Sequence, residues 1–152
     1  IPNISIKGIK IERVSSFNFL GLTLTDTLQW KDHINIISNK ISKTIGILTR
    51  IKHYVNTDIL KTIYNSLICS HINYSLLCWG HTPDRIIKLQ KRAVRIVAKA
   101  KYNAHTEPLF KKLELLRITD IFKAKALTFK FKNNQLPKYF SDMFNPQPVT
   151  HI

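Results

Sequence analysis

The residues of this chain that could carry out catalysis are few and widely spaced. Two-metal phosphoryl transfer needs clustered carboxylates, yet the 9 acidic residues include no Asp-Asp pair and no Asp-x-Asp segment. The chain also lacks a Gly-x-Ser-x-Gly elbow for a serine nucleophile and a glycine-rich loop for a phosphate. We therefore expect no catalytic residue in this chain.

Cysteine and histidine side chains provide one candidate metal site, in the segments Cys69-x-His71 and Cys78-x2-His81. Zinc ligands must converge on one point, but residues 69 and 78 do not share an obvious helix face. Their spacing also differs from that of paired zinc knuckles, and a cysteine beside apolar residues is more often a small core residue. We expect no metal site, and two cysteines are too few for a disulfide scaffold.

The strongest pattern is a basic stripe along residues 84–100, a segment with helical periodicity. At 100° per residue, spacing of i, i+3, i+4, i+7 and i+11 places five cations on one side: Lys88, Lys91, Arg92, Arg95 and Lys99. The other side is apolar: Ile86, Leu89, Ala93, Ile96, Val97 and Ala100. No acidic residue interrupts the stripe between Asp84 and Glu107. We assign the five cations to contact with nucleic-acid phosphates; the alternative is a solvated helix face.

The net charge of the whole chain supports a polyanionic partner. The 152 residues carry a formal charge of +15, and residues 84–132 alone hold 14 Lys and Arg against 4 Asp and Glu. Nucleic acid and an anionic membrane surface are the two candidates. No run of about 18 uncharged apolar residues exists, so no membrane-spanning helix is predicted. The apolar side of segment 84–100 has no Trp or Phe anchor, so we expect no membrane partner.

Hydrophobic periodicity predicts the elements that position this stripe. Residues 4–11 are predicted to form two short strands around Gly8, residues 17–25 a strand, and Asp26-Thr27 a turn. Helices are predicted from about residue 31 and over about 57–78, 84–100, 108–115 and 118–133. The fold class is mainly α: a bundle of about five helices preceded by a short N-terminal β-strand or hairpin region. The length is consistent with about one domain.

Each of the first two helices is predicted to bury one stripe of apolar side chains. In the first, the stripe is Ile34, Ile37, Ile41, Ile45 and Leu48. In the second, which Thr57 caps, it is Leu60, Ile63, Tyr64, Leu67 and Ile68. Aromatic residues could stack on bases: Trp30, Tyr64, Tyr74 and Trp79. For the two tryptophans, core or hinge packing is the favoured interpretation.

Several short segments occur in an order that resembles one protein family. They are residues 16–24 (Ser-Phe-Asn-Phe-Leu-Gly-Leu-Thr-Leu), 28–34 (Leu-Gln-Trp-Lys-Asp-His-Ile), 63–67 (Ile-Tyr-Asn-Ser-Leu), 73–74 (Asn-Tyr), 78–80 (Cys-Trp-Gly), 89–96 (Leu-Gln-Lys-Arg-Ala-Val-Arg-Ile) and 105–110 (His-Thr-Glu-Pro-Leu-Phe). Together they cover about residues 14–133. This series resembles the reverse transcriptases of non-LTR retrotransposons, especially the jockey-like elements.

The resemblance implies a segment that follows the catalytic palm motifs. Residues 1–25 would be terminal palm strands, with Phe19, Leu20 and Gly21 in a primer-grip-like turn. Residues 31–133 would be the helical thumb and connection, and residues 134–152 a proline-containing tail. The aromatic-x-Asp-Asp motif that carries the family's metal-binding carboxylates has no match here and would lie upstream. Because residue 1 is Ile and the only Met is Met143, we expect a piece of a longer chain, whose N-terminal strands are poorly supported without their partners.

By this resemblance, the segment is a nucleic-acid-binding thumb of an RNA-directed DNA polymerase, which holds an RNA–DNA hybrid or DNA duplex without performing catalysis. The parent polymerase would use Mg²⁺, whereas this segment holds no cofactor. Its protein partners would be the upstream palm and fingers of the same polyprotein, and its location intracellular, in nucleus and cytoplasm. Two alternatives stay open: a stand-alone basic nucleic-acid-binding helical domain, and a peripheral membrane or partner-helix module.

Overall fold

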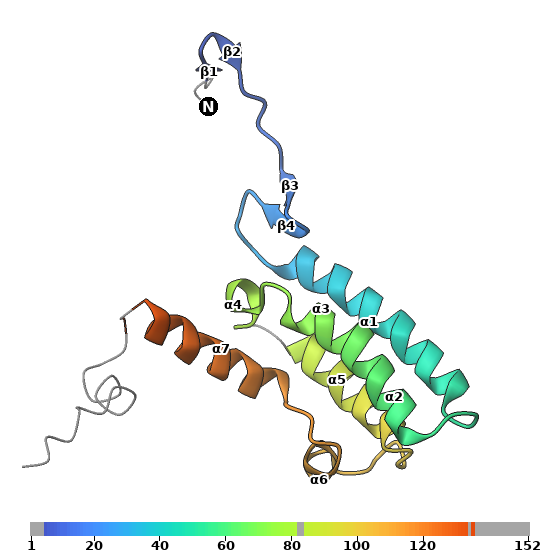
Figure 1. Ribbon diagram of the computed structural model, residues 1–152. Coiled ribbons are helices and arrows are strands. Elements are labelled where there is room, and N and C mark those ends of the chain that lie inside the picture. The colour runs from blue at the N-terminus through green and yellow to red at the C-terminus, as the bar shows by residue number, and fades with distance from the viewer. Residues whose placement is uncertain (1–4, 82–83, 134, 136–152) are drawn as a thin grey trace, which may run out of the picture.

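Residues 5–81, 84–133 and 135 are described by the computed structural model, which has β-hairpins before residue 31 and helices after it (Figure 1). The strands are β1 (Ser5–Ile6), β2 (Ile9–Lys10), β3 (Ser16–Phe19) and β4 (Leu22–Thr25). The helices are α1 (Lys31–Ile51), α2 (Thr57–Ile63), the π-helical turn η1 (Tyr64–Cys69), α3 (Ser70–Asn73), α4 (Leu76–Trp79), α5 (Asp84–Val97), α6 (Glu107–Lys112) and α7 (Ile118–Lys132). The predicted mainly helical fold class is confirmed.

Helix α1 packs along α5, and this pair forms the centre of the core (Figure 1). The predicted apolar stripe of α1 is buried, with side chains at most 8% exposed: Ile34, Ile37, Ile41, Ile45 and Leu48. From α5, the core receives Ile86, Ala93, Val94 and Val97. These positions recur every three or four residues, so each helix turns one apolar face to the other and leaves its polar face to solvent.

The second predicted helix differs from the structure in its end, its cap and its buried face. It ends at Asn73 rather than near residue 78, because Ser75 takes a left-handed conformation with φ of 46° before α4 begins. Asn56, not Thr57, is the N-cap, and its Oδ1 accepts a hydrogen bond from the Ile59 amide at 2.9 Å. Leu67 is exposed, contrary to the prediction.

The π-helical turn accounts for this changed face. Along α2, η1 and α3 the buried residues recur every four positions: Leu60, Tyr64, Ile68 and Ile72. A π-helix hydrogen-bonds i to i+5 and so has a wider turn than an α-helix. A strict four-residue spacing therefore stays on one face here, whereas Ile63 and Leu67 rotate toward its edge and the solvent.

Helices α5 and α6 end earlier than their periodicity predicted. In α5, the Lys99 amide bonds to the Ile96 carbonyl at 3.0 Å and the Ala100 amide to the Arg95 carbonyl at 2.9 Å. Lys99 is left-handed, with φ of 52°, so this end is a Schellman motif. The same motif ends α6, where Glu114 has φ of 55° and the Leu115 amide bonds to the Phe110 carbonyl. Because neither turn carries the usual glycine, no residue type in the sequence marks either helix end.

Residues 16–25 form a hairpin, whereas the sequence predicted a single strand over 17–25. Strands β3 and β4 pair antiparallel with Ser16 opposite Thr25 and Phe19 opposite Leu22. Leu20 and Gly21 connect them with φ of 48° and 77°, as in a type I′ turn. A similar turn joins β1 and β2, confirming the two strands predicted around Gly8, and the predicted turn at Asp26-Thr27 is also present.

Two side chains hold the β3–β4 hairpin on the helices, and a two-stranded hairpin needs such support. The Thr23 amide donates a hydrogen bond to His33 Nδ1 at 3.3 Å, which joins β4 to α1. The Tyr74 hydroxyl donates to the Leu20 carbonyl, and its ring lies against Gly21, where an added Cβ would lie 3.7 Å from ring Cε1. Strand β3 is fully exposed and β4 half-buried.

Replacing Tyr74 by Phe is therefore expected to loosen the hairpin turn and leave the helical core unchanged. The variant loses the bond to the Leu20 carbonyl but keeps the ring beside Gly21, so the global free energy of unfolding should change by less than about 1 kcal/mol. Amide hydrogen exchange should rise over residues 16–25 and stay constant in α1 and α5. Unchanged exchange in the hairpin would show that Tyr74 does not hold this turn.

Candidate nucleic-acid interface

Three cations on the outer side of α5 have side chains that make no hydrogen bond or ion pair with the described residues. Lys88, Lys91 and Arg92 are exposed, and no acidic side chain pairs with them among the residues that the structure describes. Lys88 and Arg92 lie four residues apart and Lys91 three from Lys88, so they share one turn of the helix. We call these three residues the α5 basic face.

The other two cations of the predicted stripe are engaged by the protein itself. Arg95 is half-buried, and its Nε donates a hydrogen bond to the Ala104 carbonyl at 2.8 Å. Lys99 lies beyond the end of α5, and its Nζ donates to the Val55 carbonyl at 2.8 Å. Both side chains brace loops beside the helix. Their assignment to phosphate contact stays a prediction, and the α5 basic face carries the argument below.

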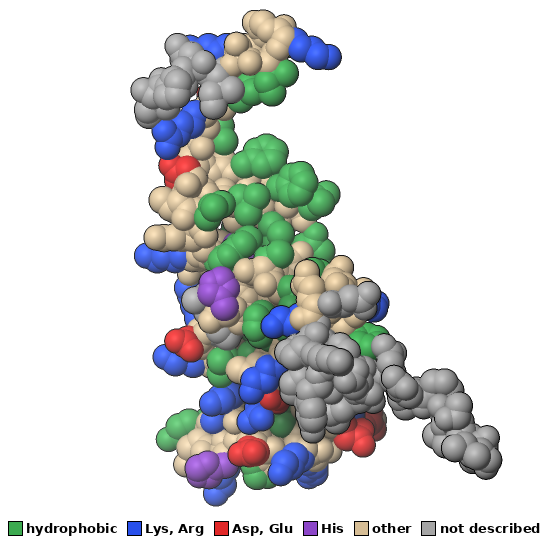
Figure 2. Space-filling view, turned by 90° about the vertical axis from the view of Figure 1, so that its left-hand side faces the viewer, with side chains coloured by type: hydrophobic (Ala, Val, Ile, Leu, Met, Phe, Trp, Pro, Cys, Tyr) green, Lys and Arg blue, Asp and Glu red, His purple; other side chains and the backbone are tan. Residues whose placement is uncertain are grey.

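More lysines lie near this face on the following elements. Lys101 follows α5, and Lys111 and Lys112 are exposed on α6. Figure 2 shows many Lys and Arg side chains, with some Asp and Glu among them, over the lower half of one side of the molecule, while hydrophobic side chains gather over its upper part around the β3–β4 hairpin. Lys101, Lys111 and Lys112 thus add exposed positive charge on the elements that follow α5.

A groove of about 840 Å³ opens between α5, α6 and the start of α7, and Lys91 lines it. Buried side chains form its floor, among them Phe110 and Ile118, whereas Lys111 and Arg117 are exposed at its margin. Arg117 pairs with Asp120 at 2.7 and 3.2 Å. This hydrogen bond lowers the pKa of the Asp120 carboxyl and raises that of the Arg117 guanidinium.

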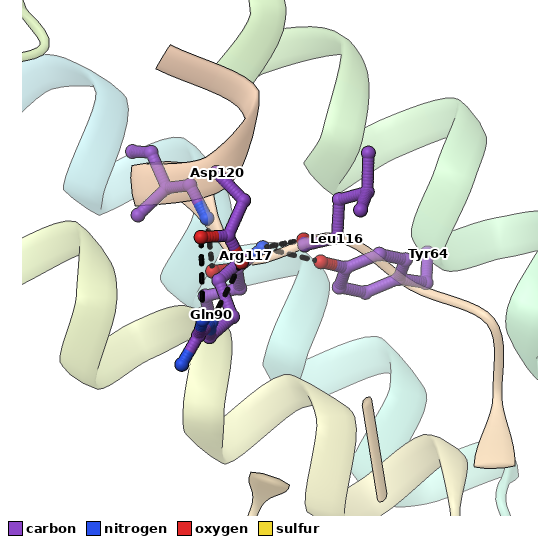
Figure 3. A network of polar contacts seen from close by, with 6 residues as sticks. Tyr64, Gln90, Leu116, Arg117 and Asp120 are labelled. Atoms are coloured by element: carbon purple, nitrogen blue, oxygen red, sulfur yellow. Dashed lines mark hydrogen bonds and ion pairs between the residues drawn. The ribbon is translucent and has the colours of Figure 1, made fainter. Parts of the chain in front are cut away.

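A buried amide fixes the elements around the groove (Figure 3). Gln90 is 1% exposed, and its Nε2 donates hydrogen bonds to the Tyr64 hydroxyl at 2.9 Å and the Leu116 carbonyl at 3.0 Å. Its Oε1 accepts from the Ile118 amide at 3.0 Å. Burial raises the pKa of the Tyr64 phenol. One side chain thus ties α5 to η1 and to the start of α7.

Sequence reasoning missed Gln90, although a signal for it exists. It stands four residues after Ile86 and three before Ala93, in the buried stripe of α5. A lone amide in an apolar stripe predicts a buried polar group that must find partners. The partners themselves lie 26 and 28 residues away along the chain, and no local pattern identifies them.

The predicted primer-grip residues lie at the hairpin turn, on a different element from the α5 basic face. Phe19 and Leu20 are 54% and 73% exposed, so they are not core residues of a strand. Gly21 has the left-handed conformation that a type I′ turn requires. The structure brings this turn beside Tyr74. A role at a primer end stays a prediction.

The aromatic residues considered for base stacking are mostly structural. Trp79 and Tyr64 are at most 1% exposed, and Trp30 packs against the core. Tyr74 is half exposed, but its hydroxyl is bonded to the hairpin. The Trp79 Nε1 donates a hydrogen bond to the Tyr74 carbonyl at 2.9 Å. The predicted core packing of Trp79 is confirmed.

The candidate metal ligands differ in burial: Cys69 and His71 are half-buried, whereas Cys78 and His81 are exposed. Asn73 Nδ2 donates a hydrogen bond to Cys69 Sγ at 3.3 Å, and burial raises the pKa of that thiol. Cys78 is an exposed free thiol. Within the described ranges, no three His, Cys, Asp or Glu side chains come together as metal ligands. None of the helices in these ranges is long and apolar enough to cross a bilayer.

His33 is a buried titratable group at the joint between the hairpin and α1. It is 3% exposed, its ring lies edge-on to Trp30 and to Trp79 at 6.1 Å, and its Nε2 has no hydrogen-bond partner in the part of the chain that the structure describes. Burial and the charge of Lys40 lower its pKa. Because Nδ1 accepts the Thr23 amide, protonation of Nδ1 removes this bond to the hairpin.

Stability is therefore expected to decrease in mild acid through His33. Its folded pKa lies below the ordinary value of 6.5, so as the pH falls below about 6.5 the unfolded chain binds the proton first. The contribution of neutral His33 to the free energy of unfolding is fully present above that pH. It is lost as the pH falls to the folded pKa, by no more than about 1.4 kcal/mol per pH unit.

Urea unfolding of the native chain and of His33→Gln between pH 7.5 and 5 measures this effect. Glutamine can accept the Thr23 amide but does not titrate, so its curve should be flatter, retaining only other contributions such as that of His71, whose pKa burial also lowers. Parallel curves for the two proteins would contradict the role of His33.

Comparisons with known protein families, with curated proteins and with solved structures find no significant match to this chain.

Proposed function

We propose that this chain is a nucleic-acid-binding, thumb-like segment of an RNA-directed DNA polymerase from a non-LTR mobile element. In this role it holds the primer–template duplex, an RNA–DNA hybrid or DNA, through phosphate contacts and contributes no catalytic group. The observation that carries the proposal is the α5 basic face. Lys88, Lys91 and Arg92 share one helical turn, are exposed, and have no acidic partner within the described chain.

The packing of α5 suits this role because it fixes the position of the cations. The opposite face of the helix is fully buried at Ile86, Ala93, Val94 and Val97, and Gln90 locks the helix to its neighbours. A rigid helix presents its charges in one arrangement, which lowers the entropic cost of ordering them on a bound backbone. Contacts of this kind position a duplex without reading its base sequence.

The β3–β4 hairpin favours a segment of a larger protein over a stand-alone domain. Phe17, Phe19 and Leu20 are all more than half exposed on one small hairpin. Clustered exposed apolar residues are typical of surfaces that contact further protein. In the proposed polymerase this protein would be the palm of the same polyprotein, as the resemblance of residues 16–24 implies.

Binding of the chain to an RNA–DNA hybrid across a salt titration tests the proposed function. Three phosphate contacts from the α5 basic face should give a slope of about −3 for log K against log salt, at about 0.9 per contact, with more from any further lysines that take part. The affinity should be similar for hybrids of different sequence. Circular dichroism on the same sample shows whether the chain is folded.

Three outcomes would contradict the proposal. They are a folded chain that does not bind the hybrid at low salt, a tenfold preference for one base sequence, and tighter binding to anionic vesicles than to the hybrid. The last outcome would support the membrane alternative instead.

A further inference from the structure

The groove beside the α5 basic face combines an apolar floor with a cationic margin. Phe110 and Ile118 are buried and Ile87 half-buried among its lining residues. At its margin, Lys91 and Lys111 are exposed, and neither makes an ion pair in the described chain. A groove of this kind fits a ligand that has a flat apolar part and a negative charge.

The charge of the groove is positive overall. Its ionised lining residues are Lys91, Lys111, Arg117 and Glu107. Arg117 uses Nε and one terminal nitrogen for Asp120, and its other terminal nitrogen has no partner among the described residues. The side chains of Thr106 and Thr119 add hydroxyl groups at the same lining. The Lys, Arg and Thr donors suit a phosphate. The Glu107 carboxylate can accept a hydrogen bond from an N–H group at the edge of a base.

The groove is also continuous with the α5 basic face, because Lys91 belongs to both. A strand whose phosphate contacts Lys91 therefore places its next nucleotide at the groove. A paired nucleotide cannot enter, since its base is stacked inside the duplex. An unpaired nucleotide can turn its base onto the apolar floor, and the volume of about 840 Å³ lies within the range of small-molecule sites.

We infer that the groove between α5 and α6 receives an unpaired nucleotide of the nucleic acid bound at the α5 basic face. Its base lies over the apolar lining at Ile87 and Phe110, and its phosphate lies between Lys91 and Lys111. This inference rests on the proposed function and adds a ligand to it: a single-stranded overhang at the end of the duplex, rather than the duplex alone.

Anisotropy measurements with three labelled hybrids test the inference: one blunt, one with a three-nucleotide single-stranded overhang, and one whose overhang is abasic. The native chain should bind the normal overhang about fivefold or more tightly than the blunt hybrid, because docking of one base on protein contributes at least this much. The abasic overhang adds the same phosphates but no base, so it should lose most of that gain.

Lys111→Glu and Lys112→Glu are the matched variants. The two lysines are adjacent and exposed on α6, but only Lys111 lines the groove. Both substitutions should weaken binding to the blunt hybrid to a similar extent, because each changes the net charge by −2. Only Lys111→Glu should also reduce the ratio of overhang to blunt affinity, toward one.

The outcomes separate this inference from the proposed function. Equal affinity for blunt and overhang hybrids, full retention of the gain by abasic overhangs, or an equal effect of the two variants on the ratio would each overturn the groove ligand while leaving duplex binding in place. Absence of binding to all three hybrids by the folded chain would overturn the proposed function, and the inference with it.

Discussion

Replacing Gln90 by Leu is expected to lower the free energy of unfolding by about 3–5 kcal/mol. The leucine side chain fills a similar space but leaves three groups without their partner: the Ile118 amide, the Leu116 carbonyl and the Tyr64 hydroxyl. Each buried polar group that loses its hydrogen bond costs about 1–3 kcal/mol. Since a domain is stable by only about 5–15 kcal/mol, the loss is large. Urea unfolding followed by circular dichroism measures it.

Two further variants show whether the hydrogen bonds cause this loss. Gln29 is exposed, so Gln29→Leu makes the same chemical change at the surface and should alter stability by less than about 0.5 kcal/mol. Tyr64→Phe removes one partner and should cost about 1 kcal/mol. In the double variant with Gln90→Leu, the combined cost should be less than the sum of the two. A cost of Gln90→Leu below 1 kcal/mol would contradict the role of this amide.

Reversing the charge of the α5 basic face is expected to lower affinity for the hybrid on the order of 10²–10³-fold at 0.1 M salt. The triple variant Lys88→Glu, Lys91→Glu and Arg92→Glu removes three phosphate contacts, each of which releases about 0.9 counterion. The slope of log K against log salt should therefore decrease in magnitude by about 3. The fold should persist, because all three side chains are exposed.

A triple variant on α1 is the matched control. Lys31, Lys43 and Arg50 are exposed and have the same residue types as the α5 basic face. Reversing them produces the same net charge, so it measures the effect of total charge alone. The slope should then stay close to that of the native chain. Equal loss of affinity in both triple variants would show that binding depends on net charge and not on α5.

Local patterns in the sequence were sufficient to predict the helical fold class, the apolar stripe of α1 and the excess of positive charge toward the C-terminal helices. These properties depend on residues three or four positions apart, which the geometry of an α-helix places on the same face. For the same reason, Lys88, Lys91 and Arg92 share one face in the structure, as their spacing predicted.

Where a segment changes conformation, the sequence was less informative. The hairpin at Leu20-Gly21 lies within an alternating apolar pattern that is equally suited to a single strand. The ends of α5 and α6 carry Lys99 and Glu114 at left-handed positions where glycine is usual. The π-helical turn at Tyr64–Cys69 altered which residues are buried. At the hairpin turn, the two helix ends and the π-helical turn, the local sequence permits more than one backbone conformation. Tertiary packing selects the conformation that is observed.

Only the tertiary structure decided which charged and polar side chains form hydrogen bonds within the protein. Lys99 bonds to Val55, 44 residues away, Gln90 to Tyr64 and Ile118, 26 and 28 residues away, and Tyr74 to Leu20, 54 residues away. Periodicity places a side chain on a face but does not state what lies opposite that face. The sequence by itself therefore determined that a basic helix faces solvent. The fold decided that three of its five cations have no partner within the described residues and that a groove opens beside Lys91, because both depend on contacts between distant segments.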